Sequence, residues 1–74
     1  MATSLLDVKG LNCPSPIIQM KKAMNSLNSG DTLEVLSTDS MSVKDFNTFC
    51  RATGNVLLES GEDDGVYRFL IQKA

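Results

Sequence analysis

Length, composition and charge limit what this chain can do. Its 74 residues suffice for one domain with a modest hydrophobic core, which leaves no room to enclose a large substrate. The net charge is −2, with seven basic and nine acidic residues, and the basic stripe of nucleic-acid-binding domains is missing. The one basic pair, Lys21-Lys22, is explained by a solvated helix face, although it could also contact a partner.

The sequence predicts a cytoplasmic protein. No apolar run approaches the ~20 residues of a membrane span. Residues 1–6 lack the basic and apolar regions of a signal peptide. Two cysteines, Cys13 and Cys50, are too few for a disulfide framework, so we expect both to be thiols.

The first half of the chain predicts a strand, a helix and a strand. Residues 4–9 alternate in polarity, as a short strand does. A helix is predicted from Pro14 to about Asn28 because apolar residues recur there every three or four positions, with Gly30 as its left-handed cap. Residues 32–38 predict a second strand. The apolar positions of these elements are Leu6, Val8, Ile17, Met20, Met24, Leu27, Leu33, Val35 and Leu36.

The second half predicts a helix followed by a hairpin. Asp39 is the preferred N-cap of the helix, with Ser42 as the alternative, and Gly54 ends it. The Asp64-Gly65 pair is a hairpin signal. The apolar side of the helix carries Val43, Phe46, Phe49, Cys50 and Thr53. The remaining predicted elements are a third strand at 55–60, a turn at 61–65 and a fourth strand at 66–72.

The element order is therefore β-α-β-α-β-β in a single domain, residues 1–74. Two strand–helix–strand units with right-handed crossovers place both helices on the same face of one sheet. We expect an α/β (α+β) two-layer sandwich, with a four-stranded mixed sheet whose other face meets solvent.

The junction between the first strand and the first helix holds the most informative residues. Gly10 breaks the strand and lets the backbone turn toward Cys13. Pro14 suits the first helical position and pushes Cys13 into the extended geometry of an N-cap, where the helix dipole favours a thiolate. Pro16 costs no helical hydrogen bond at its position, and Ser15 is left with the only free N–H of the first turn. That single donor is adequate for steadying one sulfur and poor for cradling a phosphate.

The residue types exclude several chemistries. Without histidine, the Cys–His and Ser–His–Asp machineries are unavailable, and no phosphate-binding glycine loop is present. Two cysteines without a C-x-x-C do not make a structural metal site, and no cofactor is expected. A lone thiolate can still exchange sulfur, so Cys13 fits sulfur handling or redox chemistry, with an inert thiol at a turn as the alternative. Cys50 is expected to be a buried, small apolar residue.

The motif Gly10-Leu11-Asn12-Cys13-Pro14-Ser15-Pro16, at the first strand–helix junction, resembles that of the TusA/SirA family of small sulfur carriers. The resemblance covers essentially the whole chain. The position between the two prolines is often acidic or leucine in relatives, whereas this chain has Ser15. Other matching positions are Lys21-Lys22, Asp39, Lys44-Asp45, Phe49-Cys50 and Tyr67-Arg68-Phe69.

The resemblance implies a sulfur relay. Family members carry sulfur as a persulfide on the motif cysteine, here Cys13, with Gly10, Pro14, Ser15 and Pro16 orienting it. The donor is a cysteine desulfurase or a rhodanese-like protein, and the acceptor is a DsrE/TusD-like protein. Endpoints in the family are 2-thiouridine in tRNA, molybdenum-cofactor supply and dissimilatory sulfur oxidation. Such a carrier acts as a sulfurtransferase within the relay, and whether it is an enzyme in its own right stays open.

Lys21, Lys22 and Asp45 are predicted to help partners dock; we expect a monomer that contacts neither nucleic acid nor membrane. One rival function is a small RNA-binding or regulatory module, which the acidic balance disfavours. The other is a thiol redox sensor, for which no resolving cysteine is evident.

Overall fold

The computed structural model describes residues 3–12 and 15–74. Its element order confirms the predicted β-α-β-α-β-β succession. The elements are β1 (Thr3–Val8), α1 (Ser15–Asn25), β2 (Thr32–Ser37), α2 (Met41–Thr53), β3 (Val56–Asp63) and β4 (Val66–Gln72).

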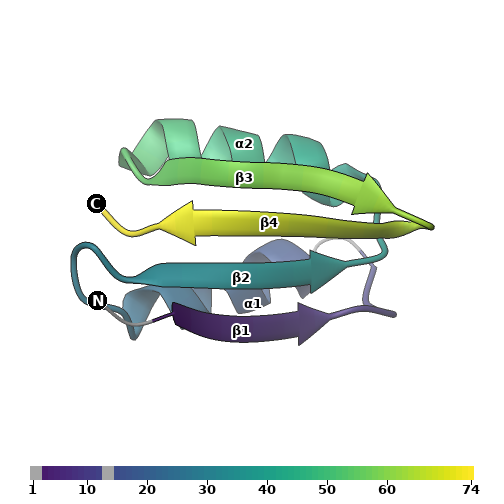
Figure 1. Ribbon diagram of the computed structural model, residues 1–74, viewed down its shortest axis with the longest axis horizontal. Coiled ribbons are helices and arrows are strands. Elements are labelled where there is room, and N and C mark those ends of the chain that lie inside the picture. Colours follow the sequence, from purple (N-terminus) through teal and green to yellow (C-terminus); the bar gives the residue numbers. More distant parts are fainter. Residues whose placement is uncertain (1–2, 13–14) are drawn as a thin grey trace.

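The four strands form one mixed sheet in the order β1-β2-β4-β3. β1 and β2 run parallel, while β4 lies between β2 and β3 and is antiparallel to both. α1 and α2 lie on the same face of the sheet (Figure 1). The predicted two-layer sandwich is therefore confirmed, with the opposite face of the sheet left open. Neither described helix is long and apolar enough to cross a membrane.

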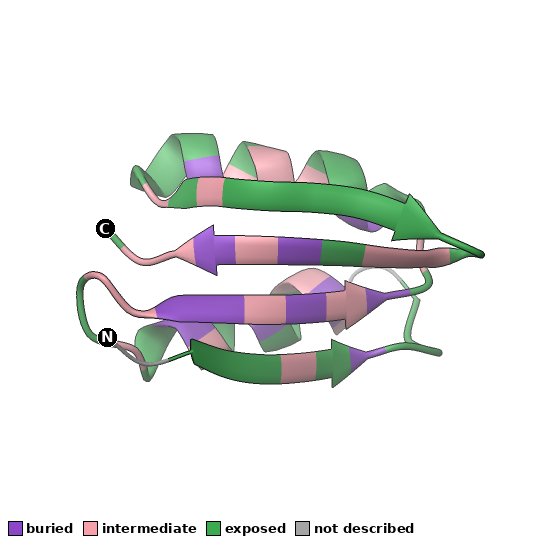
Figure 2. Cartoon of the chain, viewed as in Figure 1, coloured by how far each residue is buried: buried purple, intermediate pink, exposed green. Residues whose placement is uncertain are grey.

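The hydrophobic core lies between the helices and the sheet, and burial is concentrated on β2, β4 and the inner sides of the helices (Figure 2). Phe46 of α2 and Phe69 of β4 meet edge to face, with ring centroids 4.6 Å apart. Val43 and Thr53 were predicted on the apolar side of α2, but both are exposed. The buried hydrophobic residues among those described are Val8, Met20, Met24, Leu33, Val35, Phe46, Cys50, Phe69 and Ile71.

The predicted end of the first helix is wrong. α1 stops at Asn25, and the N–H groups of Ser26 and Leu27 donate to carbonyls three residues earlier, each at 3.1 Å, in a tightened last turn. Gly30 has a positive φ of 89°, as predicted, but it belongs to a separate turn. That turn is closed by the Asp31 N–H, which donates to the Asn28 carbonyl at 3.0 Å. Gly30 therefore does not cap the helix.

The hairpin is tighter than the sequence predicts. β3 continues to Asp63, where Asp63 pairs with Val66, so the loop is only Asp64-Gly65 instead of 61–65. Both loop residues have positive φ, 52° and 84°, as a type I′ turn requires. The Asp64-Gly65 signal was correct, and strand pairing overrides the turn-like composition before it. A register shift between Leu57 and Glu59 marks a bulge in this edge strand.

The two ends of α2 behave largely as predicted. Ser40, not Asp39, occupies the N-cap position and makes no side-chain cap bond; the Asp39 carboxylate, one residue earlier, accepts a hydrogen bond from the Met41 N–H at 3.1 Å. Ser42, the alternative cap, is instead buried with its hydroxyl 2.7 Å from that of Ser37. Gly54 ends the helix in the left-handed conformation at φ 77°.

Candidate functional site

The segment that leads from β1 toward Cys13 begins with a tight turn. Gly10 has a φ of 85°, which L-residues with a side chain rarely adopt. The Leu11 N–H donates to the Val8 carbonyl at 3.2 Å and closes the turn. Leu11 and Asn12 are both exposed. Gly10 therefore turns the backbone as the sequence predicts.

A residue distant in the sequence holds this turn. The N–H of Gly10 donates to the Thr38 hydroxyl oxygen at 2.9 Å, across 28 positions of the chain. Thr38 directly follows β2, which lies beside β1 in the sheet. The sequence reasoning missed Thr38, because a hydrogen bond between such distant residues has no local sequence signature.

Cys13 and Pro14 lie outside the described residues, so the predicted N-cap geometry of the cysteine stays a prediction. The residues on either side can be placed. The Ser15 N–H donates to the Asn12 carbonyl at 2.9 Å. The prediction that this N–H is a free donor for the sulfur is therefore wrong.

The start of α1 is nevertheless suited to a negative charge. Its first turn contains no acidic residue that would neutralise the positive end of the helix dipole. Pro16 is buried in that turn, which ties the helix start to the rest of the domain. The environment at the beginning of α1 thus favours an anion such as a thiolate or a persulfide.

A surface groove runs between the two helices. Lys21 lies over the Phe49 ring, with its ammonium nitrogen 6.0 Å from the ring centroid. Asp45 lines the same groove, whereas Lys22 does not. The structure thus brings together two of the three residues predicted to dock partners. The lining residues are Ile17, Lys21, Lys44, Asp45, Thr48, Phe49, Ala52 and Thr53.

Charge is unevenly distributed between the helices and the hairpin. The two helices carry four basic residues and only one acidic residue, Asp45, whereas the hairpin formed by β3 and β4 carries four acidic residues and only Arg68 as a base. The helix layer is therefore positive although the whole chain is negative. Such segregation orients a protein during encounters with charged partners.

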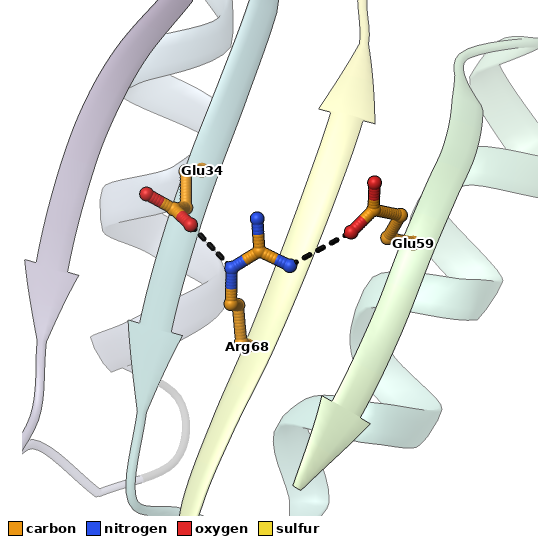
Figure 3. A network of polar contacts seen from close by, with 3 residues as sticks. All are labelled: Glu34, Glu59 and Arg68. Atoms are coloured by element: carbon orange, nitrogen blue, oxygen red, sulfur yellow. Dashed lines mark hydrogen bonds and ion pairs between the residues drawn. The ribbon is translucent and has the colours of Figure 1, made fainter.

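The open face of the sheet holds an ion-pair network. The Arg68 guanidinium on β4 contacts Glu34 on β2 and Glu59 on β3, joining three strands (Figure 3). Its Nη1 lies 2.9 Å from the Glu59 carboxylate. The hydrogen bond to Glu59, and to a lesser extent the one to Glu34, raises the pKa of the Arg68 guanidinium. Because this guanidinium is engaged on both sides, the network links β2, β4 and β3.

Cys50 fits the predicted structural role. It is 5% exposed on the inner side of α2, and burial raises the pKa of its thiol. A buried, protonated thiol is a poor nucleophile. Within the described residues, no three His, Cys, Asp or Glu side chains are close enough together to hold a metal ion.

Comparison with known proteins gives a consistent result. A family model described as "Sulfurtransferase TusA" matches residues 4–73. The "Sulfur carrier protein TusA" of Allochromatium vinosum is 52% identical over 69 residues, covering 93% of this chain and 91% of that protein. The protein of the same name from Pseudomonas putida is 36% identical, covering 95% and 88%.

A solved structure agrees with these relatives. The crystal structure of the SirA-like protein from Desulfitobacterium hafniense superposes with a TM-score of 0.81 at 30% sequence identity. The match covers 97% of this chain and 96% of the other. Both the two-layer fold and its extent are therefore similar in the two proteins.

Proposed function

The chain belongs to the TusA family of sulfurtransferases, and we propose that it accepts sulfane sulfur as a persulfide on Cys13 and passes it to partner proteins. The observation that carries this proposal is the Cys-Pro-Ser-Pro sequence, which follows the Gly10 turn and runs into the first turn of α1, in a chain similar to sulfur carriers over nearly its whole length. As a family member it acts as a sulfur carrier within a relay.

The proposed reaction is an exchange at sulfur. The Cys13 thiolate attacks the outer sulfur of a donor persulfide, a new S–S bond forms, and the donor's S–S bond breaks. The donor leaves as a thiolate, so the numbers of electrons and protons balance without an added oxidant or reductant. No proton has to be delivered to a nitrogen, which is consistent with a chain that contains no histidine. Delivery to the acceptor is the same exchange in the opposite sense.

The residues around the cysteine supply the setting for this exchange. Gly10 turns the chain away from β1, and Pro16 fixes the first turn of α1, where no carboxylate opposes a negative sulfur. Leu11 and Ile18 are exposed apolar side chains on either side of Cys13 in the sequence. They offer contact area to a partner whose active site receives the sulfur. We propose that Gly10, Pro14, Ser15 and Pro16 orient Cys13.

We assign partner docking to the groove between the helices. Lys21 and Asp45 line it, and Lys22 lies beside it on α1 as an additional basic residue. The positive helix layer suits an acidic surface on the donor, which we propose to be a cysteine desulfurase or a rhodanese-like protein. A DsrE/TusD-like protein is the proposed acceptor.

Several endpoints of the relay are compatible with the proposed carrier step. Thiolation of tRNA, molybdenum-cofactor supply and sulfur oxidation each require the same carrier step. If the endpoint is tRNA, a later protein contacts the nucleic acid, because the chain has a net charge of −2. A reducing, cytoplasmic setting would keep the thiol available.

Intact-mass measurement tests the carrier step. The protein is incubated with a bacterial cysteine desulfurase and cysteine, and its mass is then compared with that of untreated protein. We expect one added sulfur on the wild type and on Cys50→Ala, and none on Cys13→Ser. Sulfur that persists in Cys13→Ser and disappears in Cys50→Ala would overturn the assignment.

A further inference from the structure

We propose that Thr38 is a positioning residue for sulfur transfer, because its hydroxyl holds the turn that precedes Cys13. The inference rests on the proposed carrier function and extends it to a residue outside the motif. Its basis is the hydrogen bond from the Gly10 N–H to the Thr38 hydroxyl oxygen, at 2.9 Å. This bond fixes a point on the chain three residues before the cysteine to the end of β2.

Thr38 is well suited to hold another segment because its neighbours are fixed. Ser37 is 0% exposed and Ser42 is 1% exposed, and their hydroxyl oxygens lie 2.7 Å apart. The Asp39 N–H donates to the Ser37 hydroxyl at 3.1 Å. A buried pair of hydroxyls thus ties the end of β2 to the first turn of α2 on both sides of Thr38.

β1 is paired with β2 as far as Val8 and Ser37, and the bond from Gly10 to Thr38 extends this attachment into the turn. Two further hydrogen bonds, from Leu11 to Val8 and from Lys9 to the Asp7 carboxylate, are local to the end of β1. They shape the turn but do not fix it relative to α2. The bond from Gly10 to Thr38 fixes the turn relative to α2, because Thr38 begins the short segment that joins β2 to α2.

The consequence concerns geometry at the moment of transfer. A nucleophile must be placed closely against the sulfur that it attacks, and small displacements slow such reactions strongly. Thr38→Val keeps the branched shape but removes the acceptor, so the Gly10 N–H loses its partner. Thr38→Ser keeps the hydroxyl. The two variants therefore separate the hydrogen bond from the bulk of the side chain.

The first measurement needs no sulfur donor. Hydrogen exchange of the Gly10 amide is followed by NMR in the wild type, Thr38→Val and Thr38→Ser. We expect exchange to be about fivefold faster in Thr38→Val and close to wild type in Thr38→Ser, as for the loss of one hydrogen bond. Equal exchange in all three proteins would overturn the proposed role of Thr38.

The second measurement is the single-turnover transfer rate from a persulfide-charged cysteine desulfurase. At saturating donor, we expect Thr38→Val to be about fivefold slower, with the donor concentration at half-maximal rate unchanged and Thr38→Ser within twofold of wild type. A general loss of folding would weaken donor binding together with the rate, so an unchanged half-maximal donor concentration separates a positioning role from a purely structural one. Equal rates in all variants, or an equal loss in both, would overturn the inference. Failure of the wild type to take up sulfur would instead refute the carrier proposal, while Gly10 exchange still reports whether Thr38 holds the turn.

Discussion

The buried thiol of Cys50 predicts a specific loss of stability at alkaline pH. Burial raises the pKa of this thiol in the folded state, whereas in the unfolded chain it ionises near its ordinary value. Above the unfolded pKa, the unfolded state therefore binds fewer protons than the folded state. The contribution of the Cys50 thiol to the free energy of unfolding is fully present below the pKa of the thiol in the unfolded chain. It declines as the pH rises toward the pKa of the thiol in the folded protein.

The size of the effect follows from one proton. With an unfolded pKa of about 8.5, raising the pH from about 7.5 to about 9.5 lowers the free energy of unfolding by at most about 1.4 kcal/mol, the limit for a thiol that does not ionise in the folded state. A domain of this size is stable by roughly 4 to 11 kcal/mol, so the loss is a measurable fraction. The corresponding fall in Tm is roughly 6 to 11 °C.

Urea unfolding at the two pH values measures this loss, with Cys13→Ser as the parent protein so that only one thiol contributes. The control adds Cys50→Ala. Other groups titrate equally in both proteins, so the difference between their pH dependences isolates Cys50. The cavity left by Cys50→Ala lowers stability at both pH values and cancels in that difference.

Two results would contradict the reasoning. The first is an equal loss of stability between the two pH values in the parent and in Cys50→Ala. The second is fast reaction of Cys50 with a thiol reagent in the folded protein, because a side chain that is 5% exposed should react only after opening. Either result would mean that Cys50 is accessible to solvent in the folded state.

Two further predictions concern the end of α2 and the groove. Gly54→Ala should lower the free energy of unfolding by about 1 kcal/mol in urea, because φ is 77° there and no neighbouring atom contributes a clash. Gly61→Ala, in β3 with no positive φ, is the matched control and should be neutral within about 0.5 kcal/mol. Lys21→Glu should weaken binding of the donor protein about fivefold in a titration. Lys22→Glu reverses the same charge outside the groove and should have a smaller effect. Equal effects of the two charge reversals would rule out the groove as the docking site.

Much of the fold could be predicted because local patterns agree with the tertiary contacts. The helical spacing of Met20 and Met24 and the apolar side formed by Phe46 and Cys50 correctly identified core residues. Gly54 was identified as a helix end because a left-handed residue there is a local requirement. In each case, the residue's own neighbours in the sequence carry the relevant information.

Most of the wrong predictions concern residues whose structure is decided by contacts with another segment of the chain. The Gly61-to-Asp63 stretch has the composition of a turn, yet it pairs with β4 as far as Asp63. At Ser15 the error is local, because its N–H donates to the Asn12 carbonyl only three residues earlier instead of being free. Thr38 was overlooked because its partner Gly10 follows another strand. Pairing between separate segments cannot be read from the composition of either one.

The topology also bears on the choice between a carrier and a redox sensor. β1 and β2 are parallel, so they finish at the same end of the sheet, where Gly10 meets Thr38 and α2 then begins (Figure 1). Cys50 lies nine positions after Met41, or about 14 Å along α2, toward the opposite end. Cys50 is therefore buried toward the end of α2 that lies away from the Gly10 turn, where its thiol is badly placed to act as a resolving cysteine. This separation favours chemistry that needs one thiol, such as persulfide transfer, over a switch that needs two.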